Sequence, residues 1–242
     1  MSEVSIVGDV GKAAAELFVE ATAGAVAARG RAVVALTGGS SAPPLYSALL
    51  DAPWRNKIPW DSMHFFTGDE RAVPPSDPLS NWGAAARDLF AHLSLRDSQL
   101  HRMRGEAPDL DAEAARVARE LHQIAGEPPR LDLLLLGLGH DGHLFSLFAG
   151  VKTSTERGDA ELVRHVAAPR EVEPHVARLT MTPFLLITAR TVVVQVTGAG
   201  KAEALARALK GPEDLLGCPA QWLRRASGRV VVVSDAAAAA GL

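Results

Sequence analysis

The chain has 242 residues, of which 48% are hydrophobic and 22% charged, and its formal net charge is −3. This composition is ordinary for a globular protein and gives no general attraction to nucleic acid or to an anionic membrane. The single cysteine, Cys218, excludes an internal disulfide. No apolar run is long enough to span a bilayer and no secretory leader is visible, so we expect a cytoplasmic protein.

Helices and strands are expected to alternate along the chain. Apolar and β-branched runs predict strands at residues 31–37, 64–67, 131–138, 162–167, 191–197 and 229–234. Ala- and Leu-rich stretches predict helices at residues 12–29, 43–50, 110–125 and 201–210, with one from a Ser80 or Asn81 cap to residue 93 and one closing at 222–225. This order predicts a three-layer, mostly parallel, Rossmann-like α/β sheet flanked by helices. Because no linker or repeat divides residues 1–242, we expect a single domain.

The most apolar run, residues 131–138, leads into a glycine-rich motif at residues 137–146, which reads Gly-Leu-Gly-His-Asp-Gly-His-Leu-Phe-Ser. A run without alternation is typical of a strand buried on both faces of a parallel sheet. Ligands of open α/β sheets bind at the carboxyl ends of the strands, which is where Asp141 and His143 are expected. A carboxylate two residues from an imidazole can orient it and favour its protonated form, so this pair predicts acid–base chemistry.

Four predicted strands end in polar turns that contain glycine, at residues 38–41, 68–71, 137–143 and 198–201. In a parallel sheet these turns lie at one edge and can converge. Gly39, Ser40 and Ser41 precede a helix, so their N–H groups and hydroxyls suit a phosphate. The cations that can assist them are Lys201, Arg71 and Arg178. This combination predicts a phosphorylated small molecule as the substrate.

Several other motifs fail on their context. Gly137, Gly139 and Gly142 have the spacing of a dinucleotide fingerprint, but earlier strands precede them and no acid ends the next strand. The sequence before Lys201 resembles part of a Walker A loop, without its first glycine and its Ser or Thr. No Gly-x-Ser-x-Gly occurs. His140 could join Asp141 and His143 around a metal ion, but a tight turn rarely supplies several ligands, so we expect no metal and no cofactor.

The motif at residues 137–148 resembles the signature of the 6-phosphogluconolactonases, within the larger NagB/RpiA-like group that includes glucosamine-6-phosphate deaminases. Blocks at residues 37–40, 68–74 with Ser80-Asn81, 178–182 and 198–202 resemble the same family in the same order. The deaminases have Asn-Glu-Pro where this chain has Ser146-Leu147-Phe148, and Tyr where it has Arg71, so the resemblance favours the lactonases. The chain departs from the pattern at Phe145, where Ala is usual, at Ala149, and in the segment 169–175.

The resemblance implies hydrolysis of 6-phospho-D-glucono-1,5-lactone to 6-phospho-D-gluconate in the oxidative pentose phosphate pathway, without cofactor or covalent intermediate. His143 would be the general base, oriented by Asp141, with backbone N–H groups of the glycine turn as candidates for the oxyanion site. The residues expected to bind the phosphorylated substrate are Gly39, Ser40, Ser41, Asp69, Arg71, Asn81, Arg178 and Lys201. Asp69, Glu70 and Asn81 would contact sugar hydroxyls or brace the arginine, although Asn81 could serve only as a helix cap.

The alternatives to this function are an amino-sugar-phosphate deaminase and a non-catalytic sugar-phosphate sensor. We expect a monomer or weak homodimer that binds no nucleic acid or membrane.

Overall fold

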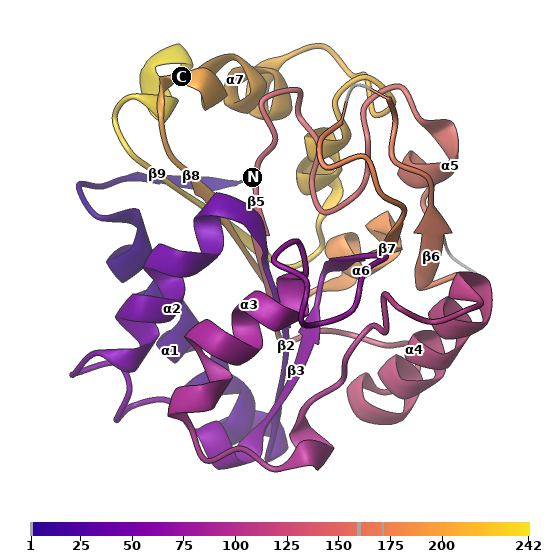
Figure 1. Cartoon of the computed structure of the whole chain (residues 1–242). Coiled ribbons are helices and arrows are strands. Elements are labelled where there is room, and N and C mark those ends of the chain that lie inside the picture. The colour runs from indigo at the N-terminus through magenta and orange to yellow at the C-terminus, as the bar shows by residue number, and fades with distance from the viewer. Residues whose placement is uncertain (1, 159–160, 171) are drawn as a thin grey trace.

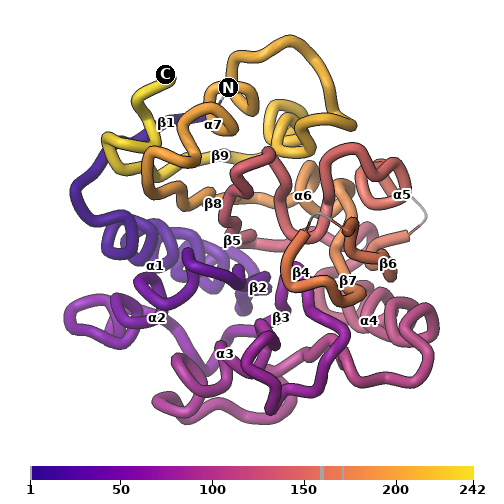
Figure 2. The backbone as a smooth tube through the Cα atoms, turned by 45° about the horizontal axis from the view of Figure 1, so that its top comes forward, coloured from indigo at the N-terminus to yellow at the C-terminus, as the bar shows by residue number. Residues whose placement is uncertain are grey.

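A six-stranded parallel sheet forms the centre of the computed structural model, which describes residues 2–158, 161–170 and 172–242. The strands run in the spatial order β1–β9–β8–β5–β2–β3, as Figure 2 shows. Their bounds are Glu3–Ile6 for β1, Ala32–Leu36 for β2, Met63–Thr67 for β3, Leu133–Gly137 for β5, Thr191–Val196 for β8 and Arg229–Ser234 for β9. Every neighbouring pair in this sheet is parallel, so all six carboxyl ends lie at one edge.

Helices cover both faces of this sheet (Figure 1). Buried side chains of α1 (Val10–Arg29), α2 (Ala42–Leu50) and α3 (Asn81–Asp88) pack on one face. Those of α4 (Leu110–Ala125), α6 (Pro183–Thr188) and α7 (Ala202–Lys210) pack on the other. The predicted three-layer, mostly parallel α/β class is therefore confirmed.

The central strands are buried on both sides because they have no polar face. In β5, Leu134 and Leu136 belong to one core and Leu133 and Leu135 to the other, and all four are fully buried. This arrangement is what an apolar run without alternation predicts. No helix in the described ranges is long and apolar enough to cross a membrane.

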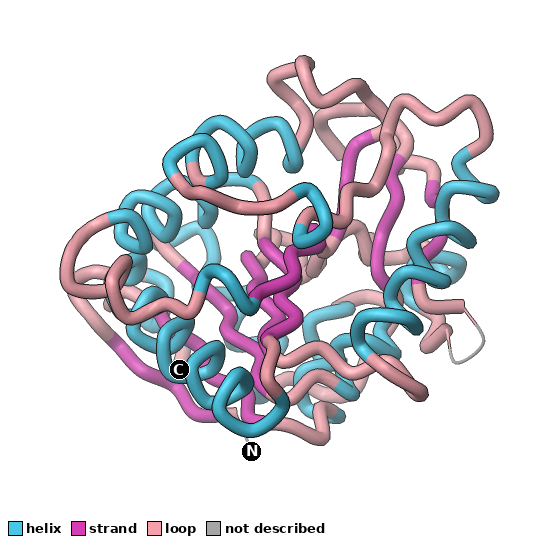
Figure 3. Tube along the Cα trace, turned by 90° about the horizontal axis from the view of Figure 1, so that it is seen from below, coloured by secondary structure: helices cyan, strands magenta, loops and turns pink. Residues whose placement is uncertain are grey.

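A second, three-stranded sheet lies beside the first and was not predicted. It consists of β4 (Asp69–Arg71), β7 (Arg178–Met181) and β6 (Val163–Val166), all antiparallel, and Figure 3 shows it apart from the central sheet. The prediction of a polar turn at residues 68–71 was wrong for β4, because a strand of three residues has too few positions to show a pattern. The strand predicted at residues 162–167 exists, as β6, but it belongs to this sheet.

The ends of some predicted helices also differ. The helix predicted to reach residue 93 ends at Asp88 and is followed by a 3-10 turn at Phe90–His92. The helix expected to close at residues 222–225 is a 3-10 helix, Pro219–Arg225. One further short helix, α5 (Lys152–Thr155), lies in the long connection after β5.

The sheet order places a topological switch point between β2 and β5. The connection after β2 contains α2 and leads to β3, whereas the connection after β5 leads through α6, on the other face, to β8. Chains that leave two neighbouring strands in opposite directions open a crevice at their carboxyl ends. A ligand site is therefore expected at the ends of β2 and β5.

Candidate active site

A pocket of about 160 Å³ occupies this crevice. Most of the sequence-predicted site residues line it, namely Gly39, Ser40, Ser41, Asp69, Arg71, Asn81, His143 and Lys201. They come from the ends of β2, β3, β5 and β8, which are consecutive neighbours in the central sheet, and from β4 and α3. Sequence reasoning missed part of the lining, which also includes Thr37, Gly38, Gly137, Leu138, Gly139 and Phe145. Gly38, Gly137, Leu138 and Gly139 lie within the predicted turns, and Thr37 and Phe145 lie within two residues of them, so their position in the sequence was the available signal.

The turn after β5 holds His143 against Asp141. The His143 Nδ1 lies 2.7 Å from Asp141 Oδ1, and the same oxygen accepts a 3.1 Å hydrogen bond from the His143 backbone N–H. A Cβ on Gly139 would lie 2.1 Å from His143 Nδ1, so this close packing requires glycine. With Nδ1 bonded to the carboxylate, Nε2 is the nitrogen available to a bound molecule.

Asp141 lies behind His143 and does not line the pocket. Burial alone would raise the pKa of its carboxyl group, but the hydrogen bond and the charge of His143 hold that pKa well below its usual range. Asp141 is therefore a carboxylate at any ordinary pH, and it accepts the hydrogen bonds of its neighbour as a charged group.

The backbone N–H groups of this turn are largely used within the turn itself. The Gly139 N–H donates to His143 O at 2.9 Å and the Gly142 N–H donates to Gly139 O at 3.1 Å. The His143 N–H is bonded to Asp141. The expectation that glycine-turn amides bind a developing oxyanion is therefore wrong for these three groups, because they already have acceptors.

The features that are expected to bind a phosphate lie on both sides of this turn. A single 3-10 turn, Gly39–Ser41, leads directly into α2, and Gly39 has a φ of 64°, a conformation that favours glycine. The first N–H groups of a helix lack partners within the helix and attract anions. Lys201 stands at the start of α7, where partial burial lowers the pKa of its ammonium and the charge of Asp141 opposes that effect.

Asp69 is fixed by two neighbours at the other end of the pocket. Its Oδ2 accepts a 2.6 Å hydrogen bond from Ser146 Oγ, and its Oδ1 accepts a 3.0 Å bond from Asn81 Nδ2. The cap of α3 is Ser80, whose Oγ accepts from the Gly83 N–H. The alternative that Asn81 serves only as a helix cap is therefore wrong.

Glu70 points away from the pocket and organises the chain around it. It is 1% exposed and accepts four hydrogen bonds, from Ser80 Oγ and from three backbone N–H groups, those of Arg71, Asn81 and Trp82. Burial raises the pKa of its carboxyl group, and the hydrogen bonds oppose that rise. It joins β4 to the start of α3, so it braces Arg71 through the backbone, and it does not line the pocket.

Arg178 is the predicted binding residue that the structure places differently. It is paired with Arg71 across the β4–β7 ladder, but its guanidinium donates to the backbone carbonyls of Pro174 and Val176 and it does not line the pocket. Burial, followed by the charge of Arg71, lowers the pKa of this arginine. The carbonyls that it binds belong to the proline-containing loop that leads into β7; position 171 of the divergent segment 169–175 lies outside the described residues. Direct contact between Arg178 and a phosphate stays a prediction.

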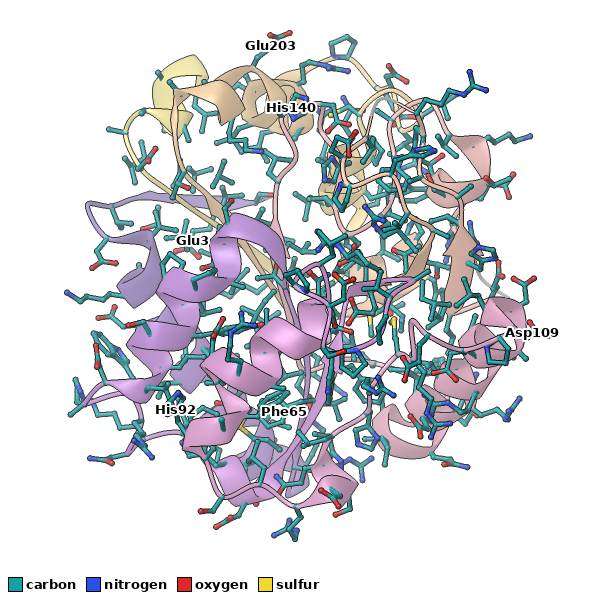
Figure 4. All side chains as sticks on the ribbon, viewed as in Figure 1. Glu3, Phe65, His92, Asp109, His140 and Glu203 are labelled. Carbon is teal, nitrogen blue, oxygen red and sulfur yellow. The ribbon has the colours of Figure 1, made fainter. Side chains whose placement is uncertain are left out.

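His140 is exposed, on the same side of the molecule as Glu203 of α7 (Figure 4), and does not line the pocket. Within residues 2–158, 161–170 and 172–242, no group of three or more His, Cys, Asp or Glu side chains is arranged to hold a metal ion.

These features define a class of protein: an α/β fold whose switch-point pocket combines cations, a helix start and a braced imidazole. Residues 8–232 match the family model of the glucosamine-6-phosphate isomerases/6-phosphogluconolactonases, and the chain belongs to this family. A 6-phosphogluconolactonase of Aggregatibacter actinomycetemcomitans is 33% identical over 196 residues, 81% of each chain. That of Mycobacterium tuberculosis is 35% identical over 210 residues, 84% of this chain and 83% of the relative. The structure of 6-phosphogluconolactonase from Trypanosoma brucei superposes with a TM-score of 0.85 at 27% identity, covering 100% of this chain and 99% of that one. The resemblance inferred from the motifs is confirmed.

Proposed function

We propose that this chain hydrolyses 6-phospho-D-glucono-1,5-lactone to 6-phospho-D-gluconate and that His143 activates the attacking water. The observation that supports this most directly is a single pocket lined by His143, Lys201 and Arg71, with Asp141 bonded to the imidazole. The names of the relatives at 33–35% identity agree with it.

A lactone carbonyl is already electrophilic, so the reaction needs a positioned base more than a covalent nucleophile. His143 Nε2 accepts a proton from water while the water oxygen forms a bond to C1, and the carbonyl oxygen takes the negative charge. The tetrahedral intermediate then collapses, the bond between C1 and the ring oxygen breaks, and the imidazolium returns its proton to that oxygen. The carboxylic acid product ionises in water. A positioned base of this kind contributes roughly 10²–10⁴-fold to the rate.

Two cations that line the pocket orient the substrate in this proposal. Lys201 follows β8 and Arg71 lies on β4, with Gly39, Ser40 and Ser41 between them. The start of α2, with Lys201, binds the phosphate, because a helix N-terminus and a point charge both suit that group. Asp69 and Asn81 contact sugar hydroxyls. Binding of the phosphate places C1 beside His143. The substrate then loses translational and rotational entropy on binding, and less of it in the chemical step.

A direct test is lactone disappearance in a coupled assay, corrected for spontaneous hydrolysis. His143→Ala should lower kcat by at least about 10²-fold with little change in KM. His140→Ala is the matched control, since it removes an exposed imidazole three residues away, and it should leave turnover unchanged. Near-normal turnover by His143→Ala would rule this residue out as the base. Release of ammonia from glucosamine-6-phosphate would indicate a deaminase, and binding of 6-phosphogluconate without rate acceleration would indicate a sensor.

Lys201→Ala tests the phosphate site separately. It should raise KM for the phosphorylated lactone by about 10–150-fold, because a charged hydrogen bond contributes roughly 1.5–3 kcal/mol. The slow hydrolysis of unphosphorylated gluconolactone should stay close to the wild-type rate. Equal losses on both substrates would contradict a role of Lys201 in binding phosphate.

A further inference from the structure

Phe145 has an unusual backbone conformation at the edge of the pocket. Its φ is 51°, and it is the one non-glycine residue with a positive φ in the described parts of the chain. The strain arises in a tight turn, in which the Leu147 N–H donates to Leu144 O at 2.9 Å. Both leucines are fully buried, so they hold the turn against the core, and Phe145 lies between them in the chain at the tip of the turn. Strained residues of this kind persist where the surrounding structure requires them, and they are frequent at functional sites.

The ring of Phe145 lies directly on the backbone of Gly68. A Cβ built on Gly68 would lie 2.0 Å from Cε1 and 2.3 Å from Cδ1 of this ring, and its three nearest atoms all belong to Phe145. The ring also lines the pocket, together with His143. The hydrophobic side chains in that lining are Phe145 and Leu138, and Leu138 is only 6% exposed. Phe145 is therefore the main carbon surface that the pocket offers to a ligand.

We propose that Phe145 is a specificity-determining residue, whose ring packs against the C–H face of a cyclic sugar-phosphate lactone; this inference rests on the proposed function. A six-membered lactone is flattened around its carbonyl and presents adjacent C–H groups on one face. Such groups pack well on an aromatic ring, whose face is electron-rich. The open-chain product is a flexible polyol with no continuous apolar face. Phe145 thus favours binding of the closed ring, and the contact is lost when the ring opens.

The test compares substrate and product affinities in Phe145→Gly. Glycine removes the ring and also tolerates the positive φ, so the relief of backbone strain offsets part of the stability lost with the packing of this ring on the core, and the variant should stay folded at the assay temperature. We expect KM for the lactone to rise about 5–20-fold with kcat within about threefold of wild type, since the contact is uniform binding energy. The inhibition constant of 6-phosphogluconate should change by less than about twofold, because the open-chain product lacks the C–H face that packs on the Phe145 ring. Phe145→Tyr keeps the ring and should retain the wild-type KM.

Gly68 provides an independent arm of the same experiment. Gly68→Ala places a methyl group where the Phe145 ring lies, so the ring must move into the pocket and KM should rise by at least as much as in Phe145→Gly. In the double variant that combines Gly68→Ala with Phe145→Gly, no ring occupies the space of the new methyl group. The KM of the double variant should therefore equal that of Phe145→Gly alone.

A KM for Phe145→Gly within twofold of wild type would overturn the proposal, as would a parallel rise in KM and in the product inhibition constant. If the wild-type protein accelerates hydrolysis of the lactone, either of these results refutes only this inference. Absence of acceleration by the wild-type protein refutes the proposed function and this inference with it.

Discussion

Asp141→Asn tests whether the carboxylate beside His143 contributes to catalysis through its charge. The substitution keeps the shape of the side chain and removes the negative charge from the atom that lies 2.7 Å from His143 Nδ1. A hydrogen bond to a charged group contributes about 1.5–3 kcal/mol, and this contribution is greatest when the imidazole is protonated, midway through the reaction. Its loss predicts a fall in kcat of about 10–150-fold at little change in KM.

The assay is the background-corrected turnover of the phosphorylated lactone over a range of pH. The pKa of Asp141 is well below its usual range, so protonation of this carboxylate plays no part in any loss of activity at mildly acidic pH. Asp109→Asn, at the exposed cap of α4, is the matched control for the same chemical change and should be neutral. A kcat of Asp141→Asn within threefold of wild type, or an effect confined to KM, would refute the reasoning.

Three further substitutions test the packing around His143, the hydrogen bonds of Glu70 and the effect of His101 on stability. Gly139→Ala should lower kcat at least about 10²-fold with near-normal melting, because its Cβ would lie 2.1 Å from His143 Nδ1; normal activity would contradict the packing. Glu70→Gln should lower the melting temperature by about 5–10 °C, since an amide group would face a backbone N–H, and an unchanged value in calorimetry would argue against the network. Burial, then the neighbouring His64 and Arg116, lowers the pKa of His101 to about 4. The unfolded chain therefore binds more protons between about pH 6.5 and 4, so stability should fall by about 1–2 kcal/mol from pH 6.5 to 5. Urea unfolding should show this loss, and His101→Gln should reduce it; an equal loss in that variant would exclude His101 as its source.

The central sheet could be predicted because its signal is local. The strands β2, β5, β8 and β9 each contain a run of at least three apolar residues, and each lies within the range expected from the sequence. The helix predicted at residues 110–125 has those ends in the structure, where Asp109 caps its start and Gly126 follows its last residue. In contrast, β1 is mostly exposed and partly polar, so it gives no hydrophobic pattern, and its strand form depends on pairing with β9.

The candidate site was predictable to the extent that its residues lie in short turns. The prediction that the segments after four strands converge follows from the parallel sheet alone, and the shared pocket agrees with it, although the segment at residues 68–71 is the strand β4 and not a turn. The partners of the long polar side chains depend on contacts distant in sequence. Ser146 is bonded to Asp69, which lies 77 positions earlier, and nothing near either residue indicates that bond.

The difference between the two sheets has a consequence for how substitutions should act. Lys201 and His143 follow strands of the central sheet, whose positions are set by a large buried core. Arg71 and Asp69 belong to β4, a strand of three residues that has little core of its own and is joined to α3 by Glu70. Damage to the Glu70 network should therefore raise KM for the lactone as well as lower the melting temperature. Damage to the core under β5 and β8 should reduce the amount of folded protein, while the molecules that fold keep the normal KM.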